Sequence, residues 1–461
     1  MLGRNESEPT LFQMVNLNAL VPPGHRLRRI DAVLDLSFVR ETVEACYKAG
    51  QGRPSVDPEL ALRMMLLGVL YDLPERELCD EIAMHAGFRW FCRLNFHDPV
   101  PDHSTLSRLR NERWAESGIW EKLRDEVLRQ CRDAGLLSGR HLSTDGTQVE
   151  ANASMKSLRP VGPRRVPPEG EDPPAGGTRR VQEPAAKGDW KGHGQKITNQ
   201  THRSISDPDA RMYRKGKKQS ARLSYLVHDL IDTKGRVILR TRASLASSFA
   251  ERDVTLEQVD EVLADPELLP ARPEILTADA GYGIGEFVAE LLDRGITPHV
   301  PLQGGREMES LPTWKRRPRT LVEARSRRHR LRLAQARNQT REEYRTRGYQ
   351  VSRKLRIRSE HVFAEAKTQH GLRRARRRGL EQVQVQAELT AAVQNLKRLA
   401  AHVHRRRGAA GTAVIPRAQG AHSSLRRLPY IPIRRPPGPL RTRHLRRPMY
   451  TLKNGRSSTC T

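Results

Sequence analysis

Three charged residues lie on one expected helix late in the chain. In the segment RKLRIRSEHVFAEAKTQHGL, Arg356, Glu360 and Lys367 stand four and seven positions apart. At 100° per residue their side chains fall within about 40° of one another, and Glu365 lies on the opposite face. A carboxylate with a cation on either side is suited to hold a metal ion next to a bound phosphate group.

Two aspartates in strand-like segments complete a set of three carboxylates. Asp145 lies in HLSTDGTQVEA and Asp279 lies in EILTADAGYG. If these strands are neighbours in one sheet, the two side chains meet, and Glu360 arrives from a helix packed on that sheet. Carboxylates can hold two divalent cations roughly 3.5–4 Å apart, which activate the attacking oxygen and stabilise the leaving oxygen of a phosphodiester. We therefore predict metal-dependent phosphoryl transfer, with Mg²⁺ as the metal and Mn²⁺ as a substitute.

Each of these signals has an ordinary structural explanation when taken alone. An Asp before Gly is usually a turn former, Asp279 can cap the next helix, and Glu360 can be a solvated i,i+4 partner. The occurrence of all three in this order favours the catalytic interpretation. His299 and His361 lie near these motifs, and we expect them to pack or contact phosphate rather than bind metal.

The charge of the chain points to a polyanionic partner. Its 461 residues include 82 Lys and Arg against 53 Asp and Glu, a formal net charge of +29. Nucleic acid is the usual partner of such a chain. A membrane is the rival, but the most apolar run, LALRMMLLGVLYDL, is too short to span a bilayer and suits a buried helix. The N-terminus shows no signal-peptide pattern, so we expect a cytoplasmic protein acting on DNA.

The number and spacing of the cysteines argue against a zinc-stabilised or disulfide-stabilised domain. There are five, an odd number, and no two of them form a CxxC pair. Neither a structural zinc site nor a disulfide framework is therefore expected.

Residues 1–135 are expected to form an all-helical N-terminal domain. Asp57 and Pro58 are an N-cap and first-turn pair that starts the apolar helix. The segment PDHSTLSRLRNERW should start another helix with Ser104 as its cap, which places Arg108 and Arg110 one turn further on. Short helices with a basic last member resemble a helix-turn-helix that binds DNA through Arg108 and Arg110. An ordinary helical bundle with a basic surface fits equally well.

Residues 139–405 are expected to form a mixed α/β domain. The pattern predicts a strand at HLSTDGTQVEANAS, a hairpin that turns at residues 232–235, a helix at about 251–264 and a strand at 274–279. Further helices follow, with a short strand near His299. Strands first and alternating helices and strands later are typical of a mixed sheet flanked by helices.

Two stretches lack the composition of a packed core. Residues 156–220 are rich in Pro, Gly, Lys and Arg, which predicts a mobile basic insertion. Residues 406–461 are expected to be a disordered tail: from Ala401 to Thr461 there are fourteen Lys and Arg, seven Pro and no acidic residue. The tail could be a DNA-binding arm or the product of out-of-frame or read-through coding sequence.

Taken together, these motifs resemble insertion-sequence transposases of the DDE type with a Tyr–Arg–Glu–Lys signature. That signature places three residues between Arg and Glu and six between Glu and Lys, as Arg356, Glu360 and Lys367 are placed here. Arg353 stands at the position of the signature's Tyr. STDGT and TADAGYG are similar to the family's two aspartate motifs, and RGLEQVQVQAELTAAVQNLKRL is similar to its C-terminal helix. The similarity runs from about residue 10 to residue 405.

The resemblance implies a ribonuclease H-like fold in which Asp145, Asp279 and Glu360 hold the metal ions. Arg356 and Lys367 would then contact DNA phosphates near the bond that is cut. The implied reaction nicks DNA at the terminal inverted repeats by attack of water, and the freed 3′-hydroxyl ends then join target DNA. Pairing two DNA ends implies a homodimer or larger assembly.

Two alternatives stay open at this point. One is a catalytically silent DNA-binding protein derived from a transposase, which Arg353 and the unpatterned tail favour and the three carboxylates oppose. The other is a structure-specific nuclease on the same fold, which would cut DNA without joining it.

Overall fold

The computed structural model describes residues 16–47, 55–161, 197–214, 216, 219–247 and 250–411, without the side chains of residues 250 and 407–411. By contacts the chain divides into Met1–Gly411 and Thr412–Thr461. The second unit, and with it nearly all of the predicted tail, lies outside the described residues. So do residues 162–196 of the predicted insertion.

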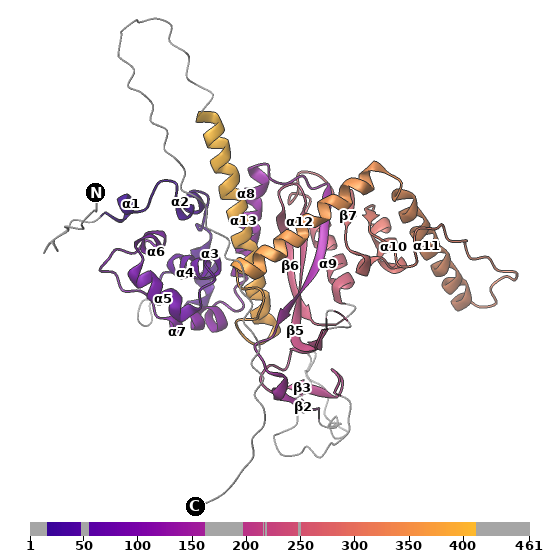
Figure 1. Ribbon diagram of the computed structural model, residues 1–461, viewed down its shortest axis with the longest axis horizontal. Coiled ribbons are helices and arrows are strands. Elements are labelled where there is room, and N and C mark those ends of the chain that lie inside the picture. Colours follow the sequence, from indigo (N-terminus) through magenta and orange to yellow (C-terminus); the bar gives the residue numbers. More distant parts are fainter. Residues whose placement is uncertain are drawn as a thin grey trace, which may run out of the picture. The chain divides into compact units, whose positions relative to one another are not determined.

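The elements that the structure describes before residue 135 are all helical (Figure 1). They are α1 (Leu17–Leu20), α2 (Arg26–Asp31), α3 (Val39–Val43), η1 (Glu44–Cys46), α4 (Pro58–Leu70), α5 (Glu75–Met84), α6 (Ala86–Phe91), α7 (His103–Arg108), η2 (Leu109–Arg113) and α8 (Ile119–Asp133). None of the described helices is both long and apolar enough to cross a bilayer.

Aspartate side chains cap the starts of two of these helices. Asp57 caps α4 as predicted, since its Oδ1 accepts a hydrogen bond of 2.8 Å from the backbone N–H of Glu59. The cap predicted for α7 was wrong by two residues. Asp102, not Ser104, is the cap, and its Oδ1 accepts from the backbone N–H of Ser104 at 2.8 Å.

A mixed sheet forms the second half of the described chain. Its strands are β1 (His141–Glu150), β4 (Arg211–Tyr213), β5 (Arg222–Asp232), β6 (Val237–Leu245), β7 (Ile275–Thr277) and β8 (Thr297–His299). The hydrogen-bonded order is β4-β5-β1-β7-β8, and β5 also pairs with β6. β5 is antiparallel to both of its neighbours β1 and β6, whereas β7 and β8 run parallel to β1. The predicted hairpin is confirmed, because β5 and β6 are joined through residues 233–236.

Part of the predicted insertion is strand. β2 (Leu158–Pro160) and β3 (His202–Ser204) form a separate antiparallel pair, next to the short 3₁₀ turn η3 (Met155–Ser157). β4 joins the main sheet beside β5. The prediction of an unstructured insertion over 156–220 was therefore wrong for these three strands.

Helices cover the sheet on both faces. α9 (Ala250–Ala264) packs on β5 and β6, with the Thr255 hydroxyl 2.9 Å from that of Thr144. α12 (Arg347–Gln369) packs on the other face, with the Ser359 hydroxyl 2.5 Å from that of Ser143. Successive residues of a strand point to opposite faces, so Thr144 and Ser143 identify the two sides. The remaining elements are η4 (Ala280–Tyr282), α10 (Gly285–Asp293), α11 (Leu321–Glu343) and α13 (Leu380–Gly411).

α13 packs against both the N-terminal helices and the sheet. It contacts α2, α4 and α8 on the helical side and β5 and β6 on the sheet (Figure 1). One apolar cluster accordingly includes Leu27 of α2, Leu62 of α4, Leu239 of β6 and Leu396 of α13. The hydrophobic core is therefore continuous across the boundary that the sequence predicted near residue 135.

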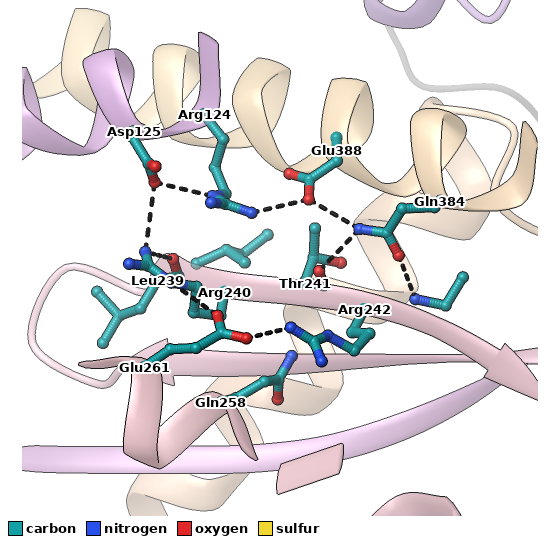
Figure 2. A network of polar contacts seen from close by, with 12 residues as sticks. Arg124, Asp125, Leu239, Arg240, Thr241, Arg242, Gln258, Glu261, Gln384 and Glu388 are labelled. Atoms are coloured by element: carbon teal, nitrogen blue, oxygen red, sulfur yellow. Dashed lines mark hydrogen bonds and ion pairs between the residues drawn. The ribbon is translucent and has the colours of Figure 1, made fainter. Parts of the chain in front are cut away.

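A network of charged side chains crosses the same junction (Figure 2). Arg124 of α8 donates to Glu388 of α13 at 2.7 Å, and both side chains are less than one-tenth exposed. Asp125 accepts from Arg240 of β6 at 3.3 Å. Gln384 of α13 donates to Glu388 at 2.8 Å. Because each group has a partner from another element, the network fixes how α8, α13 and β6 lie against one another.

Candidate active site

The two predicted aspartates lie at the point where β7 leaves β1. β7 pairs with β1 only along His141–Ser143, and it ends at Thr277. Asp145 is two residues beyond that pairing on β1, and Asp279 is two residues beyond the end of β7. Parallel neighbouring strands thus bring the two carboxylates to one edge of the sheet, as the sequence predicted.

The charge of Asp279 acts on Asp145. Burial, and after it the charge of Asp279, raises the pKa of Asp145 to about 6. The carboxylate of Asp145 accepts a 2.8 Å hydrogen bond from the backbone N–H of Gly146. Asp279 caps η4 and accepts at 2.8 Å from the backbone N–H of Gly281. Two neighbouring carboxylates, one of them with a raised pKa, are a donor set that a divalent cation would stabilise.

α12 brings Glu360 and Arg356 to the same face of the sheet as Asp145. Besides the Ser143–Ser359 contact, Ser352 of α12 lies 2.7 Å from the imidazole of His141. Arg356 forms an ion pair with Glu360 across one helical turn, with 3.0 Å between the guanidinium nitrogen and the carboxylate oxygen. Its positive charge also lowers the pKa of Asp145, which places the guanidinium near the first aspartate. Glu360 is about half exposed.

The described side chains contain no group of three or more His, Cys, Asp or Glu positioned to hold a metal ion. The three predicted carboxylates are therefore not gathered around one point. Glu360 is instead paired with Arg356. The fit to a metal rests on the chemistry of Asp145 and Asp279, two carboxylate oxygen ligands, of which Asp145 has a raised pKa. Glu360 would have to release Arg356 to join them.

The predicted DNA contacts differ in their surroundings. Lys367 lies half-buried in the last turn of α12, and Arg108 is exposed at the end of α7. Arg110 does not fit the prediction, because its side chain is only 1% exposed and forms an ion pair with Glu75. A buried guanidinium that already has a carboxylate partner is not available to a DNA phosphate. We therefore remove Arg110 from the proposed DNA contacts.

His299 and His361 occupy different positions. His299 is buried, with its Nδ1 2.6 Å from the hydroxyl of Ser352, and it contacts the ring of Tyr349. Burial lowers the pKa of His299, as expected for a packing residue. His361 is exposed on α12.

Two acidic residues near the site were missed by the sequence analysis. Asp229 on β5 is the direct cross-strand partner of Asp145. Glu251 at the start of α9 lies on the other side of β1, with its Oε1 3.1 Å from the position that a Cβ on Gly146 would take. Its charge raises the pKa of Asp145. Asp229 gave no signal because it follows the apolar run LSYLVH, where we expected a simple hairpin strand.

Two family models match this chain. The model described as Transposase domain (DUF772) matches residues 15–112. The model described as Transposase DDE domain matches residues 189–396, a span that includes Asp279 and Glu360 but not Asp145. No solved structure matches the chain. The mixed sheet with flanking helices is consistent with a ribonuclease H-like DDE domain, and the chain is a DDE-type DNA transposase enzyme of the insertion-sequence kind. DDE transposase domains generally use divalent metal ions.

Proposed function

We propose that this enzyme binds the terminal inverted repeats of its own insertion sequence, cuts the DNA ends by hydrolysis and joins the 3′-hydroxyl ends to target DNA. Asp145, Asp279 and Glu360 are the catalytic carboxylates in this proposal, and Mg²⁺ is the metal they hold, with Mn²⁺ as a substitute. The observation that carries it is the approach of Asp145 and Asp279 at the edge of β1, where the charge of Asp279 acts on Asp145.

The topology supports a ribonuclease H-like catalytic domain. In the order β6-β5-β1-β7-β8, the first aspartate is on the central strand β1, and the second follows the adjacent parallel strand β7. The third carboxylate comes from a helix packed on the same sheet. The spacing of Arg356, Glu360 and Lys367 supports assignment to the group with the Tyr–Arg–Glu–Lys signature, with Arg353 at the Tyr position.

The side chains of the site have separate tasks in the proposed reaction. A bound divalent metal supplies an activated water and neutralises charge on the phosphate. Asp145 and Asp279 orient the ligand set, because both carboxylates are held by backbone N–H groups. If Glu360 joined the metal ligands, its ion pair with Arg356 would open, and the guanidinium of Arg356 would be free to contact a phosphate oxygen.

DNA is the partner in this proposal, both as inverted repeats and as target. Lys367, Arg356 and the exposed Arg108 are the proposed phosphate contacts. The excess of Lys and Arg over Asp and Glu supports a strong electrostatic attraction to the backbone. Because two DNA ends must be held together, we propose a homodimer or larger assembly on DNA.

The test is a nick-mapping experiment on DNA that spans both flanks of the gene. Purified protein and Mg²⁺ should give cuts at a matched pair of inverted repeats, and the products should include strands joined to target DNA. Asp279→Asn should abolish the cuts and leave DNA binding largely intact, whereas the exposed control Glu267→Gln should cut normally. Cuts without joined products would favour the structure-specific nuclease. Binding without cuts would favour the silent DNA-binding protein.

A further inference from the structure

A cationic pocket lies where the end of α8, the β5–β6 turn, α12 and the C-terminal part of α13 meet. Five of its lining side chains carry a fixed positive charge, and a histidine adds a sixth nitrogen group: Lys234, Arg236, Lys397, Arg398, Arg405 and His402. Among the lining residues that the structure describes, Glu365 is the one carboxylate. The pocket is distinct from the edge of β1 that holds the two aspartates.

The carboxylate of Glu365 already forms ion pairs with neighbouring side chains. It accepts from Lys397 at 2.5 Å and from Arg398 at 3.0 Å, and the buried imidazole of His370 lies 3.6 Å from it. These cations hold the pKa of Glu365 well below its usual range, against the effect of burial. One negative charge therefore faces five positive ones, and the excess must be balanced by solvent or by an anion.

Two buried polar atoms of the lining lack a partner. Nη1 of Arg398 and Nε2 of His402 have no hydrogen-bond partner among the residues that the structure describes. Buried polar atoms of this kind are rare in folded proteins because each loses its hydration without compensation. The side chain of Arg398 is 11% exposed, so it has little access to water. An anion with several acceptor oxygens would supply the missing partners.

The turn between β5 and β6 is held in a fixed shape that presents two more cations. Arg236 has φ of 57°, a left-handed conformation that is unusual for a residue other than Gly, Asn or Asp. Asp232 caps the turn by accepting from the backbone N–H of Lys234 at 2.9 Å. Arg358 of α12 donates to the carbonyl oxygens of Thr233 and Lys234. Lys234 and Arg236 are exposed on this turn.

We propose that this pocket binds a phosphate group, and that in the working enzyme the group is a backbone phosphate of the DNA. Both Glu360 and Glu365 are on α12; at 1.5 Å and 100° per residue they are about 7.5 Å apart along the helix axis and about 140° apart around it, so the pocket lies on the far side of the helix from Glu360. The pocket therefore borders the catalytic helix, and a duplex that is cut beside Glu360 has other phosphates in the neighbourhood. The phosphate site itself rests on the pocket, and only the identity of its donor rests on the proposed function.

The test removes two of the exposed cations of the pocket, Arg236 and Arg405, without disturbing its buried ion pairs. Asn replaces Arg236 because it tolerates a positive φ, and Gln replaces Arg405 because it is a good helix former. The matched control is Arg40→Gln with Arg129→Gln, two exposed arginines that already pair with carboxylates. DNA binding is measured without metal over a range of salt concentrations. The pocket variant should lower the slope of log affinity against log salt by about 1–2, and the control should leave it unchanged.

A second arm uses inorganic phosphate as the probe. Phosphate should raise the melting temperature of the wild type above the effect of chloride at equal ionic strength, and the pocket variant should lose most of this gain. An unchanged salt slope together with an unchanged phosphate effect would overturn the inference. Loss of the phosphate effect with unchanged DNA binding would overturn the assignment to DNA. A wild type that binds no DNA would contradict the proposed function, and the phosphate arm would then decide the pocket alone.

Discussion

Asp145 of β1 and Asp229 of β5 are directly opposite each other in the antiparallel pairing of the two strands. Paired residues lie on the same face of a sheet, so a second carboxyl lies beside the first of the proposed catalytic aspartates. Asp229 is buried and accepts a 2.7 Å hydrogen bond from the Thr241 hydroxyl. Burial raises the pKa of Asp229 to about 7, and the charge of Asp145 adds to the effect. β1 and β5 thus each carry a carboxyl group whose charged form the fold by itself does not favour.

We predict that Asp145→Asn stabilises the metal-free protein above about pH 6. The folded-state pKa of Asp145 is raised from 3.8 to about 6, so the folded protein binds an extra proton between these values. The free energy of unfolding therefore falls as the pH rises through this window, and the loss persists above it. Asn removes this loss, a gain of about 1–3 kcal/mol at about pH 8 and close to none at about pH 4.

Denaturant unfolding with a chelator present, at both pH values, measures this difference. The exposed Asp265→Asn is the control, and it should show no gain at either pH. Equal stability of Asp145→Asn and wild type at about pH 8 would show that the raised pKa is absent in solution.

Cleavage should lose rate in acid because protons compete with the metal at Asp145. Below about pH 6 that carboxyl becomes protonated, so metal affinity falls by up to tenfold per pH unit for one proton. Cleavage at subsaturating Mg²⁺ should then fall with the same slope, and additional Mg²⁺ should restore it. A rate that falls equally at saturating metal would place the titrating group elsewhere.

Glu360→Gln and Glu365→Gln should have opposite effects on activity and stability. Because Glu360 is a proposed metal ligand, Glu360→Gln should abolish cleavage. Because Glu360 is half exposed, the change in stability should be small. Because Glu365 lies on the opposite face of the helix, Glu365→Gln should do little to cleavage by the folded enzyme. It should lower stability, because Gln would leave Lys397 and Arg398 without their carboxylate. The expected loss is about 2–4 kcal/mol.

These two variants are compared by unfolding midpoint and by cleavage per folded molecule. Glu381→Gln on the exposed start of α13 controls for loss of a helix carboxylate. Full cleavage by Glu360→Gln together with none by folded Glu365→Gln would reverse our assignment of the catalytic helix face.

Glu75 should be a stability residue that joins the N-terminal helices to the α12–α13 connection. It accepts from the buried Arg110 and, at 2.8 Å, from Arg377. Glu75→Gln leaves two guanidinium groups short of a counter-charge, so we expect a loss of about 2–4 kcal/mol. Glu77→Gln, two residues along the same helix, should change little. A loss of DNA affinity in Glu75→Gln without loss of stability would mean that Arg110 contacts DNA after all.

Removing residues 412–461 should weaken non-specific DNA binding while the remainder stays folded. The deletion follows the last described residue of α13 and removes Lys and Arg but no acidic residue. Each phosphate contact that is lost should lower the salt slope by about one. The expected result is a smaller slope with an unchanged melting temperature. An unchanged slope would show that the tail is not a DNA-binding arm.

Elements with a strong local pattern were predictable from the sequence. The hairpin of β5 and β6, helix α9 and the cap at Asp57 were each expected within one or two residues of where they lie. The neighbouring positions of β1 and β7, which unite Asp145 and Asp279, followed from the strand patterns and the chemistry of the aspartates. These features depend on contacts close in sequence or on a single pairing.

Features set by distant partners were not predictable. Arg110 lies in a polar segment, and only the approach of Glu75, 35 residues earlier, makes its burial favourable. β4 is three residues long and forms because β5 offers it an edge. In the sequence alone, its basic surroundings suggested an insertion. The spacing of Arg356 and Glu360 was compatible with their ion pair. It gave no sign that Glu360 would lie apart from the two aspartates.

The shared position of α13 affects what a shortened copy of this gene can produce. A stop codon before residue 380 would remove the helix that closes the cores of both α4 and β6. The N-terminal helices would then expose Leu27 and Leu62, and the product would be prone to aggregation and proteolysis. We therefore expect that a truncated copy does not survive as a free-standing DNA-binding repressor, whereas a full-length copy with a single damaged carboxylate keeps its whole core.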